Sequence, residues 1–192
     1  MTNKNRAASS TEGFFQAIPQ VGNQYGEDAS LKHAVLQFMP QHIVDNISSD
    51  LSSFGSRVLG PEVLSLVKDA EYNPPRLETW DTFGQRKDEL ITSNGWQQLQ
   101  AIGIREGIVA IPYEGIHKQY SRLYQFAKYH LWCGSNAIVT CPSAMTDGAA
   151  ALLKSHLKDN KMNEDQSIAL KSAYRRLTSR DPTYAWTSGQ WM

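Results

Sequence analysis

The sequence predicts an all-α fold, and three observations lead to this prediction. Apolar residues recur every three to four positions through most of residues 28–177, which is the spacing of a buried helix face. Prolines and glycines stand between these periodic segments, where helices start or stop. The only run of β-branched residues, residues 137–140, is too short to define a strand. With 41% hydrophobic residues among 192, the chain has enough apolar side chains for a packed core.

Three helices are expected in the first part of the chain, over residues 28–39, 41–59 and 61–70. Asp28 or Ser30 caps the first helix, and Pro40 ends it because the residue before a proline avoids helical geometry. Pro61 fits the first turn of the third helix, where its missing N–H is not needed. The predicted apolar faces contain Leu31, Ala34, Val35 and Phe38, then Ile43, Ile47, Leu51, Phe54 and Val58, then Val63, Leu64 and Val67.

Residues 73–92 show no regular pattern and are expected to form an irregular connection. The segment Asn73-Pro74-Pro75 is a rigid, extended break, and Gly84 marks a turn. Trp80, Phe83 and Leu90 are expected to pack this connection onto the core. A short helix follows, and its apolar residues are Trp96, Leu99 and Ile102.

The strongest helix prediction covers residues 113–132. Gly134 is expected to close this helix, and Pro142 to open the next one over residues 143–157. Asn163 is expected to cap a last helix that ends near Leu177. The buried face of the helix over residues 113–132 is expected to contain Ile116, Tyr120, Leu123, Tyr124, Ala127 and Leu131, with Lys118, Arg122 and Lys128 elsewhere.

The chain divides into three parts by composition. Loop formers dominate residues 1–26, which are expected to form an extended N-terminal arm. Residues 27–180 hold all the predicted helices and form the helical domain. Residues 181–192 are rich in Tyr and Trp and are expected to lead into a further structure outside this sequence.

Charge and cysteine content exclude several classes of protein. The 19 basic and 19 acidic residues balance, so no overall field favours nucleic acid or an anionic membrane. No apolar run reaches the ~18 residues that cross a bilayer, and residues 1–12 lack a secretory signal. Only Cys133 and Cys141 are present, so a disulfide framework is not expected. An intracellular location follows, with the cytoplasm as first expectation and the peroxisome and mitochondrion left open.

Residue patterns alone indicate neither a catalytic residue nor a metal site. Cys133 and Cys141, with His130 nearby, lack the spacing of a zinc site, and buried structural cysteines are the favoured interpretation. The sequence has no Gly-rich phosphate loop and no Ser-His-Asp set in a recognisable context.

Two charged features have open interpretations. Asp147 lies in the otherwise nearly uncharged stretch of residues 131–153, where it either caps backbone N–H groups near a helix start or contacts a polar ligand. Arg175, Arg176 and Arg180 either hold a phosphate or form a solvated helix end that matches the helix dipole, and the second interpretation is favoured.

Four segments in order resemble the AidB-like branch of the acyl-CoA dehydrogenase superfamily. The first starts at Asn73-Pro74-Pro75 and runs through Trp96. The second is Gly134 followed by residues 141–146 (Cys-Pro-Ser-Ala-Met-Thr), and the third is the small-residue and leucine run 149–153. The fourth comprises residues 177–181 and 189–192, which lead up to the flavin-binding signature of the family. The resemblance covers about residues 20–192.

This resemblance implies a protein with a helical N-terminal domain, a middle β-domain and a C-terminal helical bundle. The chain would hold the first domain and the first residues of the β-domain. FAD is the implied cofactor, with Gln190, Trp191 and Met192 at flavin-contacting positions. An acyl-CoA-type substrate is implied as well. The residues that the resemblance assigns to the substrate pocket wall are Met145, Thr146 and Asp147.

The resulting hypothesis is the N-terminal part of an FAD-dependent acyl-CoA dehydrogenase-like oxidoreductase. When full length it would dehydrogenate an acyl thioester at the α,β position, with a carboxylate base in the absent C-terminal region. The fragment alone would be inactive, and homo-oligomers would form through the absent bundle. Alternatives are a flavin-containing DNA-damage (alkylation) response protein and a non-catalytic helical interaction domain. In each case no nucleic acid and no membrane is expected to bind this segment.

Overall fold

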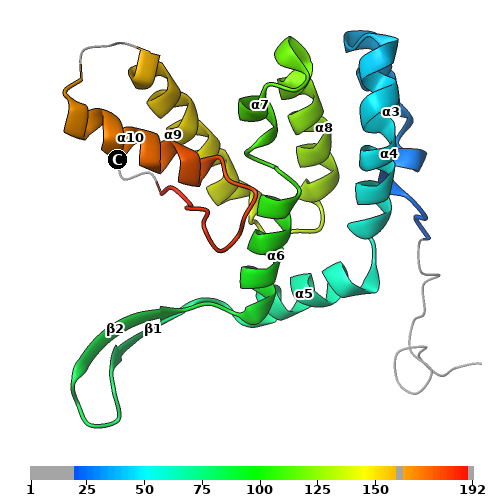
Figure 1. The fold of residues 1–192 in the computed structure, drawn as a ribbon. Coiled ribbons are helices and arrows are strands. Elements are labelled where there is room, and N and C mark those ends of the chain that lie inside the picture. The colour runs from blue at the N-terminus through cyan, green and yellow to red at the C-terminus, as the bar shows by residue number, and fades with distance from the viewer. Residues whose placement is uncertain (1–19, 159–161, 190–192) are drawn as a thin grey trace, which may run out of the picture.

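The computed structural model describes residues 20–158 and 162–189, and it shows a helical body from which one β-hairpin projects (Figure 1). The predicted helical fold is confirmed, whereas most of the predicted N-terminal arm lies outside the described residues. In chain order the elements are α2 (Gln24–Glu27), α3 (Ala29–Phe38), α4 (Gln41–Arg57), α5 (Pro61–Tyr72), β1 (Arg76–Trp80), β2 (Arg86–Ile91), α6 (Asn94–Arg105), α7 (Ile111–Glu114), the 3-10 helix η1 (Lys118–Tyr120), α8 (Ser121–Cys133), α9 (Thr140–Lys158) and α10 (Glu164–Leu177).

The first helices form as their capping and periodicity predict. The Asp28 carboxylate caps α3 by accepting a hydrogen bond from the Leu31 backbone N–H at 2.8 Å. All five apolar residues predicted on α4 are buried, and Phe54 lies 5.7 Å from the Trp132 ring of α8. The predicted buried faces of α3 and α5 each included one residue that is exposed, namely Phe38 on α3 and Leu64 on α5. Most side chains of the shared core come from the helices α2, α3, α4, α5, α6 and α8.

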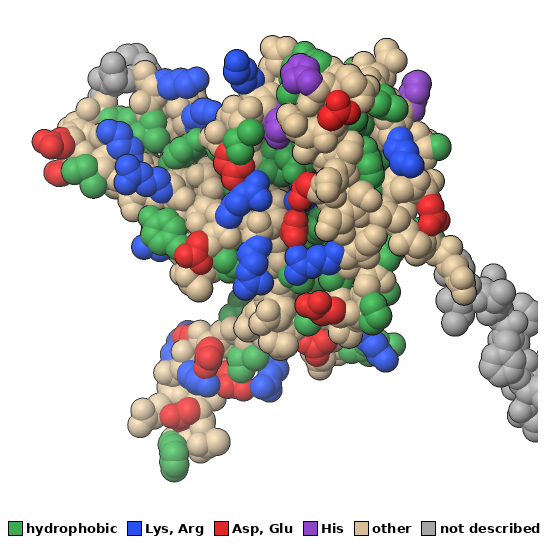
Figure 2. Space-filling view, turned by 45° about the vertical axis from the view of Figure 1, so that its right-hand side comes forward, with side chains coloured by type: hydrophobic (Ala, Val, Ile, Leu, Met, Phe, Trp, Pro, Cys, Tyr) green, Lys and Arg blue, Asp and Glu red, His purple; other side chains and the backbone are tan. Residues whose placement is uncertain are grey.

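The irregular connection predicted for residues 73–92 is wrong, because β1 and β2 form an antiparallel hairpin. Leu77 pairs with Leu90 and Glu78 with Glu89, and a bulge interrupts the register before Trp80. Trp80, Phe83 and Leu90 are exposed and do not pack on the core, Phe83 being 89% exposed. Since the core covers neither face, the hairpin shows no alternation of polar and apolar residues. Figure 2 shows charges of both signs on the hairpin and over this face of the body.

The crossing of α5 and α6 depends on Gly95. An added Cβ at this position would lie 2.3 Å from the Leu66 carbonyl oxygen, so only glycine allows the two backbones to approach this closely. The Gly95 N–H donates to the Asp69 carboxylate at 2.6 Å, which joins the start of α6 to α5.

The helix predicted over residues 113–132 is interrupted before its regular part begins. Gly115 adopts φ 72° and ends α7, so the regular helix starts only at Ser121. As a result Ile116 is exposed, and Leu123 is partly exposed as well. The placement of Lys128 outside the buried face is also wrong, because its side chain is 1% exposed.

The joint between α8 and α9 is a tight turn built around the buried Asn136. Its side-chain amide donates to the Trp132 and Cys133 carbonyl oxygens at 2.6 and 2.8 Å and accepts from the Thr140 N–H at 3.1 Å. Ala137 and Ile138 both adopt left-handed backbone geometry, with φ of 46° and 68°. Gly134 follows the last residue of α8, as predicted, and Pro142 lies in the first turn of α9.

The last helix begins as its sequence predicts. Asn163 and Gln166 form a capping box, in which each side chain bonds the backbone of the other residue. After α10 the chain turns back past α6 and α9 (Figure 1). Residues 181–188 are called the lead-in segment below. None of the described helices is both long and apolar enough to cross a membrane.

Candidate functional site

The three residues that the resemblance assigns to a pocket wall follow one another on α9. Because successive residues of a helix point about 100° apart, they do not share one face. Thr146 is buried and faces the lead-in segment, whereas Asp147 faces α8. Met145 is half-buried and lines neither of the two hollows beside these residues. The structure therefore separates the three predicted positions.

Asp147 accepts hydrogen bonds from three side chains of two other elements. The Tyr113 hydroxyl donates at 2.5 Å, the Arg122 guanidinium at 2.5 Å and the Gln125 amide at 3.0 Å. Gln125 is buried and also donates to the Ile108 carbonyl oxygen at 2.9 Å. Asp147 lies well inside α9, so the interpretation as a backbone cap is wrong. These side chains supply the partners that a half-buried carboxylate requires.

The electrostatics of this cluster keep its donors protonated. Burial, reinforced by the Asp147 hydrogen bond, raises the pKa of Tyr113 far above its ordinary value. Burial by itself would lower the pKa of Arg122, but its hydrogen bonds to Asp147 and Tyr113 outweigh burial and raise that pKa. Two cations flank the Tyr113 ring, with the Arg122 guanidinium carbon 5.1 Å and the Lys154 ammonium 5.3 Å from its centroid.

A groove of about 390 Å³ runs between α8 and α9 beside this cluster. Small residues of α9 form one wall and keep the groove wide, and aromatic residues of α8 form the opposite wall. Burial raises the pKa of Tyr129 in this wall to about 12, and its hydroxyl donates to the Thr140 carbonyl oxygen. The groove, called the α8–α9 groove below, is lined by Arg122, Phe126, Tyr129, Ala144, Asp147, Gly148 and Ala151. Its mostly apolar walls, with the Arg122 and Asp147 side chains among them, suit an aliphatic group that carries a polar part.

The opposite side of α9 contacts the lead-in segment. The Thr146 hydroxyl accepts from the Ser188 N–H at 3.0 Å and donates to the Pro142 carbonyl oxygen at 2.7 Å. A small hollow of about 30 Å³ lies there, between Val139 and Trp186. Gln190, Trp191 and Met192, the predicted flavin-contacting residues, lie outside the described residues.

A profile of the Adaptive response protein AidB N-terminal domain matches residues 17–174. The chain belongs to this family. Acyl-CoA dehydrogenase family member 11 of Caenorhabditis elegans is 40% identical over 183 residues, which is 95% of this chain and 29% of that protein. The chain thus spans less than a third of this curated relative.

Two solved structures share the fold. The crystal structure of Caenorhabditis elegans ACDH-11 in complex with C11-CoA superposes with a TM-score of 0.84 at 38% identity, covering 100% of this chain and 32% of that one. The apo-form of Bd2924 superposes with a TM-score of 0.80 at 34% identity, covering 93% and 34%. The fold of the described residues is therefore that of an acyl-CoA dehydrogenase N-terminal helical domain.

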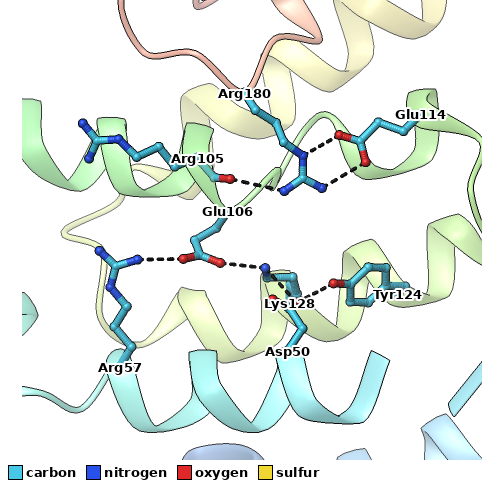
Figure 3. Close-up of polar contacts among 8 residues, drawn as sticks. All are labelled: Asp50, Arg57, Arg105, Glu106, Glu114, Tyr124, Lys128 and Arg180. Carbon is cyan, nitrogen blue, oxygen red and sulfur yellow. Dashed lines mark hydrogen bonds and ion pairs between the residues drawn. The ribbon is translucent and has the colours of Figure 1, made fainter. Parts of the chain in front are cut away.

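This AidB N-terminal domain also contains an ionic network around the buried Lys128 that sequence reasoning missed (Figure 3). The Lys128 ammonium lies 2.9 Å from the Asp50 carboxylate and 2.7 Å from that of Glu106. Glu106 also pairs with Arg57 at 2.7 Å, while Asp50 accepts a hydrogen bond from the Tyr124 hydroxyl. The network joins α4, α8 and the end of α6. One signal was present in the sequence, since Lys128 stands four residues after Tyr124 and three before Leu131, on the predicted buried stripe.

The remaining candidate groups of this AidB N-terminal domain do not form a site. Cys133 and Cys141 are exposed free thiols, so the prediction that they are buried is wrong. Within the described residues no group of three His, Cys, Asp or Glu side chains is arranged to hold a metal ion. Arg180 lies beyond the end of α10, where it pairs with both carboxylate oxygens of Glu114 and donates to the Arg105 carbonyl oxygen (Figure 3).

Proposed function

We propose that this AidB N-terminal domain walls the acyl cavity of a flavin-dependent, acyl-CoA dehydrogenase-like oxidoreductase. The observation that carries the proposal is the α8–α9 groove, which combines apolar walls with the paired Asp147 and Arg122 side chains. The complex of the related ACDH-11 with C11-CoA supports an acyl thioester as the ligand class. The reaction proposed for the whole protein is α,β-dehydrogenation of that thioester.

In this proposal the helical domain binds and orients, and it does not transfer protons. The cluster of Asp147, Tyr113, Arg122 and Gln125 holds the polar side chains of the groove rigid, because each donor is paired. Of the three residues predicted for the pocket wall, only Asp147 lines this groove. The catalytic base and most of the flavin site belong to sequence outside these 192 residues, so the isolated chain is expected to be inactive.

FAD is the proposed cofactor of the whole protein, where it would accept a hydride from the β-carbon of the substrate. Gln190, Trp191 and Met192 supply an amide, an aromatic ring and a thioether, which suit the polar edge and flat face of the flavin ring. Residues 181–192 are accordingly proposed as the entry into a β-domain.

A role in the response to DNA alkylation is the second candidate, and the description of the matched family as an adaptive response protein favours it. Positive and negative side chains are interspersed on the face in Figure 2, which offers no extended basic surface to DNA. Since the whole chain also carries no net charge, DNA binding is expected only from other parts of a longer protein. Salt-dependent DNA binding by the 192-residue chain itself would contradict this assignment.

The first test is the intact mass and flavin absorbance of the protein purified from its native source. A mass well above 21.5 kDa with a flavin spectrum, followed by bleaching of the flavin when acyl-CoA is added without oxygen, would support the proposal. A mass of 21.5 kDa without flavin would contradict it. It would favour a non-catalytic helical interaction domain.

A matched pair of variants tests the α8–α9 groove in that native form. Ala151→Phe fills the groove and is expected to weaken acyl-CoA binding about tenfold or more, equivalent to ~1.4 kcal/mol. Ser172→Phe places the same ring on an exposed position of α10 and is expected to leave binding unchanged. Equal affinity of both variants for acyl-CoA would show that the α8–α9 groove is not part of the acyl cavity.

A further inference from the structure

The helical core covers neither face of the β1–β2 hairpin, which projects from the end of α5 and the start of α6 (Figures 1 and 2). Its strands have five and six residues, so at ~3.3 Å per residue the hairpin is about 20 Å long. A hairpin of two strands is only marginally stable in water unless a further element packs against it. A surface that packs against this hairpin is therefore expected.

The tip of the hairpin presents Phe83 on an ordered turn. The Asp81 carboxylate accepts hydrogen bonds from the Phe83 and Gln85 N–H groups, both at 2.8 Å. Gly84 takes the left-handed φ of 79° that this turn requires. The Phe83 side chain is nevertheless almost fully exposed. An exposed aromatic ring on a preorganised turn suits the anchor of a protein contact, because it buries a large area and loses little entropy on binding.

The strands of the hairpin offer apolar side chains, while several of their charges pair with one another. Leu77 and Leu90 lie opposite each other in the register, and both are exposed. The Lys87 ammonium lies 3.0 Å from the Glu78 carboxylate and 2.5 Å from that of Glu89. The bulge in β1 and these charged side chains oppose the addition of a further strand at the edges. The expected partner is therefore an apolar surface that is contacted through side chains.

A groove of about 190 Å³ between α3 and α8 has the matching properties. This α3–α8 groove is lined mainly by Val35, Phe38, Leu123, Phe126, Ala127 and His130. The rings of Phe38 and Phe126 are exposed and can pack against a further aromatic ring. His130 pairs with Asp28 at 3.0 Å, so an apolar occupant would not isolate a charge at this end of the groove.

The hairpin does not reach the α3–α8 groove of its own chain, because the two lie at opposite ends of the helical body (Figure 1). We propose that the hairpin of one copy docks Phe83 in the α3–α8 groove of a second copy, whose hairpin docks in the first. Such reciprocal exchange closes a two-fold dimer, in which each copy contributes one hairpin and one groove. This inference does not rest on the proposed function, and the contact is separate from the oligomer contacts expected of the absent bundle.

Phe83→Ser and Phe126→Ser each remove one side of this contact from the 192-residue chain. Both rings are exposed, so circular dichroism should show an unchanged fold. Dimerisation, measured by analytical ultracentrifugation at high protein concentration, is expected to weaken about 100-fold in either variant, because the dimer loses two contacts worth about tenfold each. Ile168→Ser changes an exposed apolar residue of α10 and should dimerise like the wild type.

Mixing the two variants distinguishes this pairing from a contact between like surfaces. In a mixed dimer, the intact Phe83 of the Phe126→Ser copy meets the intact groove of the Phe83→Ser copy, so one of the two contacts returns. Fluorescently labelled Phe83→Ser is therefore expected to bind Phe126→Ser about tenfold more tightly than it binds itself. Fluorescence-detected sedimentation measures both affinities.

Three results would overturn the inference. A wild-type chain that stays monomeric at high concentration would assign the hairpin to another occupant, such as a further part of a longer protein. Unchanged dimerisation of either variant would exclude its side of the contact. Weak dimerisation of both variants without a gain on mixing would show that hairpin and groove are not partners. None of these results bears on flavin or acyl-CoA binding, so the proposed function is tested separately.

Discussion

Lys128 places a positive charge beside the apolar core, where its ammonium lies 4.9 Å from the centroid of the Phe54 ring. Desolvation makes such a charge costly unless it is paired, and Asp50 and Glu106 provide the pairing. Lys128→Met would leave both carboxylates without their shared cation. The free energy of unfolding, measured in urea, is expected to fall by about 3 kcal/mol.

Lys171→Met is the control for this substitution. Lys171 is exposed on α10, and its replacement is expected to change stability by less than about 0.5 kcal/mol. Equal stability of the two variants would show that the network does not hold α4 and α8 together.

Asp28 links the stability of the domain to pH. The Leu31 N–H that it caps, and then the neighbouring His130, lower the pKa of Asp28 below its ordinary value of 3.8. The folded pKa is thus below the unfolded one, so this stabilisation is complete above pH ~4 and is lost as the pH falls through the folded pKa. Asp28→Asn keeps the cap but not the charge.

The expected result is a smaller loss of stability for Asp28→Asn than for the wild type between pH 5 and pH 3, measured by chemical unfolding. At pH 7, Asp28→Ala should lose about 1 kcal/mol, because the cap itself is gone. Parallel pH profiles for the wild type and Asp28→Asn would exclude this role of the carboxylate.

Single residues also show where sequence reasoning reaches its limit. The burial of Lys128 could not be predicted from a rule that assigns charges to the surface, since the rule ignores partners that come from other helices. The same limit applies to Asp147, whose partners come from α7 and α8. For Cys133 and Cys141 the prediction of burial was wrong for a different reason. The small, weakly polar character of cysteine does not decide whether a residue near a turn faces the core or the solvent.

The crossing of α5 and α6 is the element most sensitive to one methyl group. Gly95→Ala would drive a Cβ into the Leu66 carbonyl oxygen and force the two helices apart. The expected cost is about 2 kcal/mol or more in the free energy of unfolding. Gly134→Ala is the matched control, since its Cβ would meet no atom within 4 Å and its φ is −78°. The control should be neutral or slightly stabilising; a Gly95→Ala variant of similar stability would contradict the tight crossing.

Helices that bury one face in the core could be predicted from the sequence, whereas the hairpin, which buries neither face, could not. On α4 the spacing of Ile43, Ile47 and Leu51 identified the buried side, because the core supplies a strong and regular constraint. Neither face of the hairpin packs on the core, so the sequence of β1 and β2 has no regular apolar pattern. The turn at Gly84 was the signal that the sequence offered there. At the start of the predicted helix over residues 113–132, Gly115 was the overlooked breaker.

The molecule as a whole leaves an apolar area uncovered on α3 and α8. Phe38 and Leu123 line a groove of about 190 Å³ together with Phe126, which is 59% exposed. Apolar surface of this kind promotes association in isolated domains. Phe126→Ser is expected to lower the binding of a hydrophobic dye and the apparent size of the 192-residue chain at high concentration. Folding should be unaffected, because the ring is not in the core.

Ile168→Ser serves as the comparison, since Ile168 is 60% exposed but lies on α10. It should change dye binding less than Phe126→Ser does. A larger effect at Ile168 would move the associating surface to α9 and α10, and homo-oligomerisation would then have to be sought there.

The joint between α8 and α9 sets a limit on heat resistance. Ile138 adopts a left-handed conformation that a β-branched residue rarely takes, although its side chain is 70% exposed and gains little burial in return. Ile138→Gly would remove this strain of about 1–2 kcal/mol, less the ~0.5–1 kcal/mol of entropy that glycine adds to the unfolded chain. The melting temperature should therefore rise by about 2 °C, measured by calorimetry against Ile168→Gly, which should lower it. The melting temperature of the natural domain is thus lower than the same fold would allow with glycine at position 138.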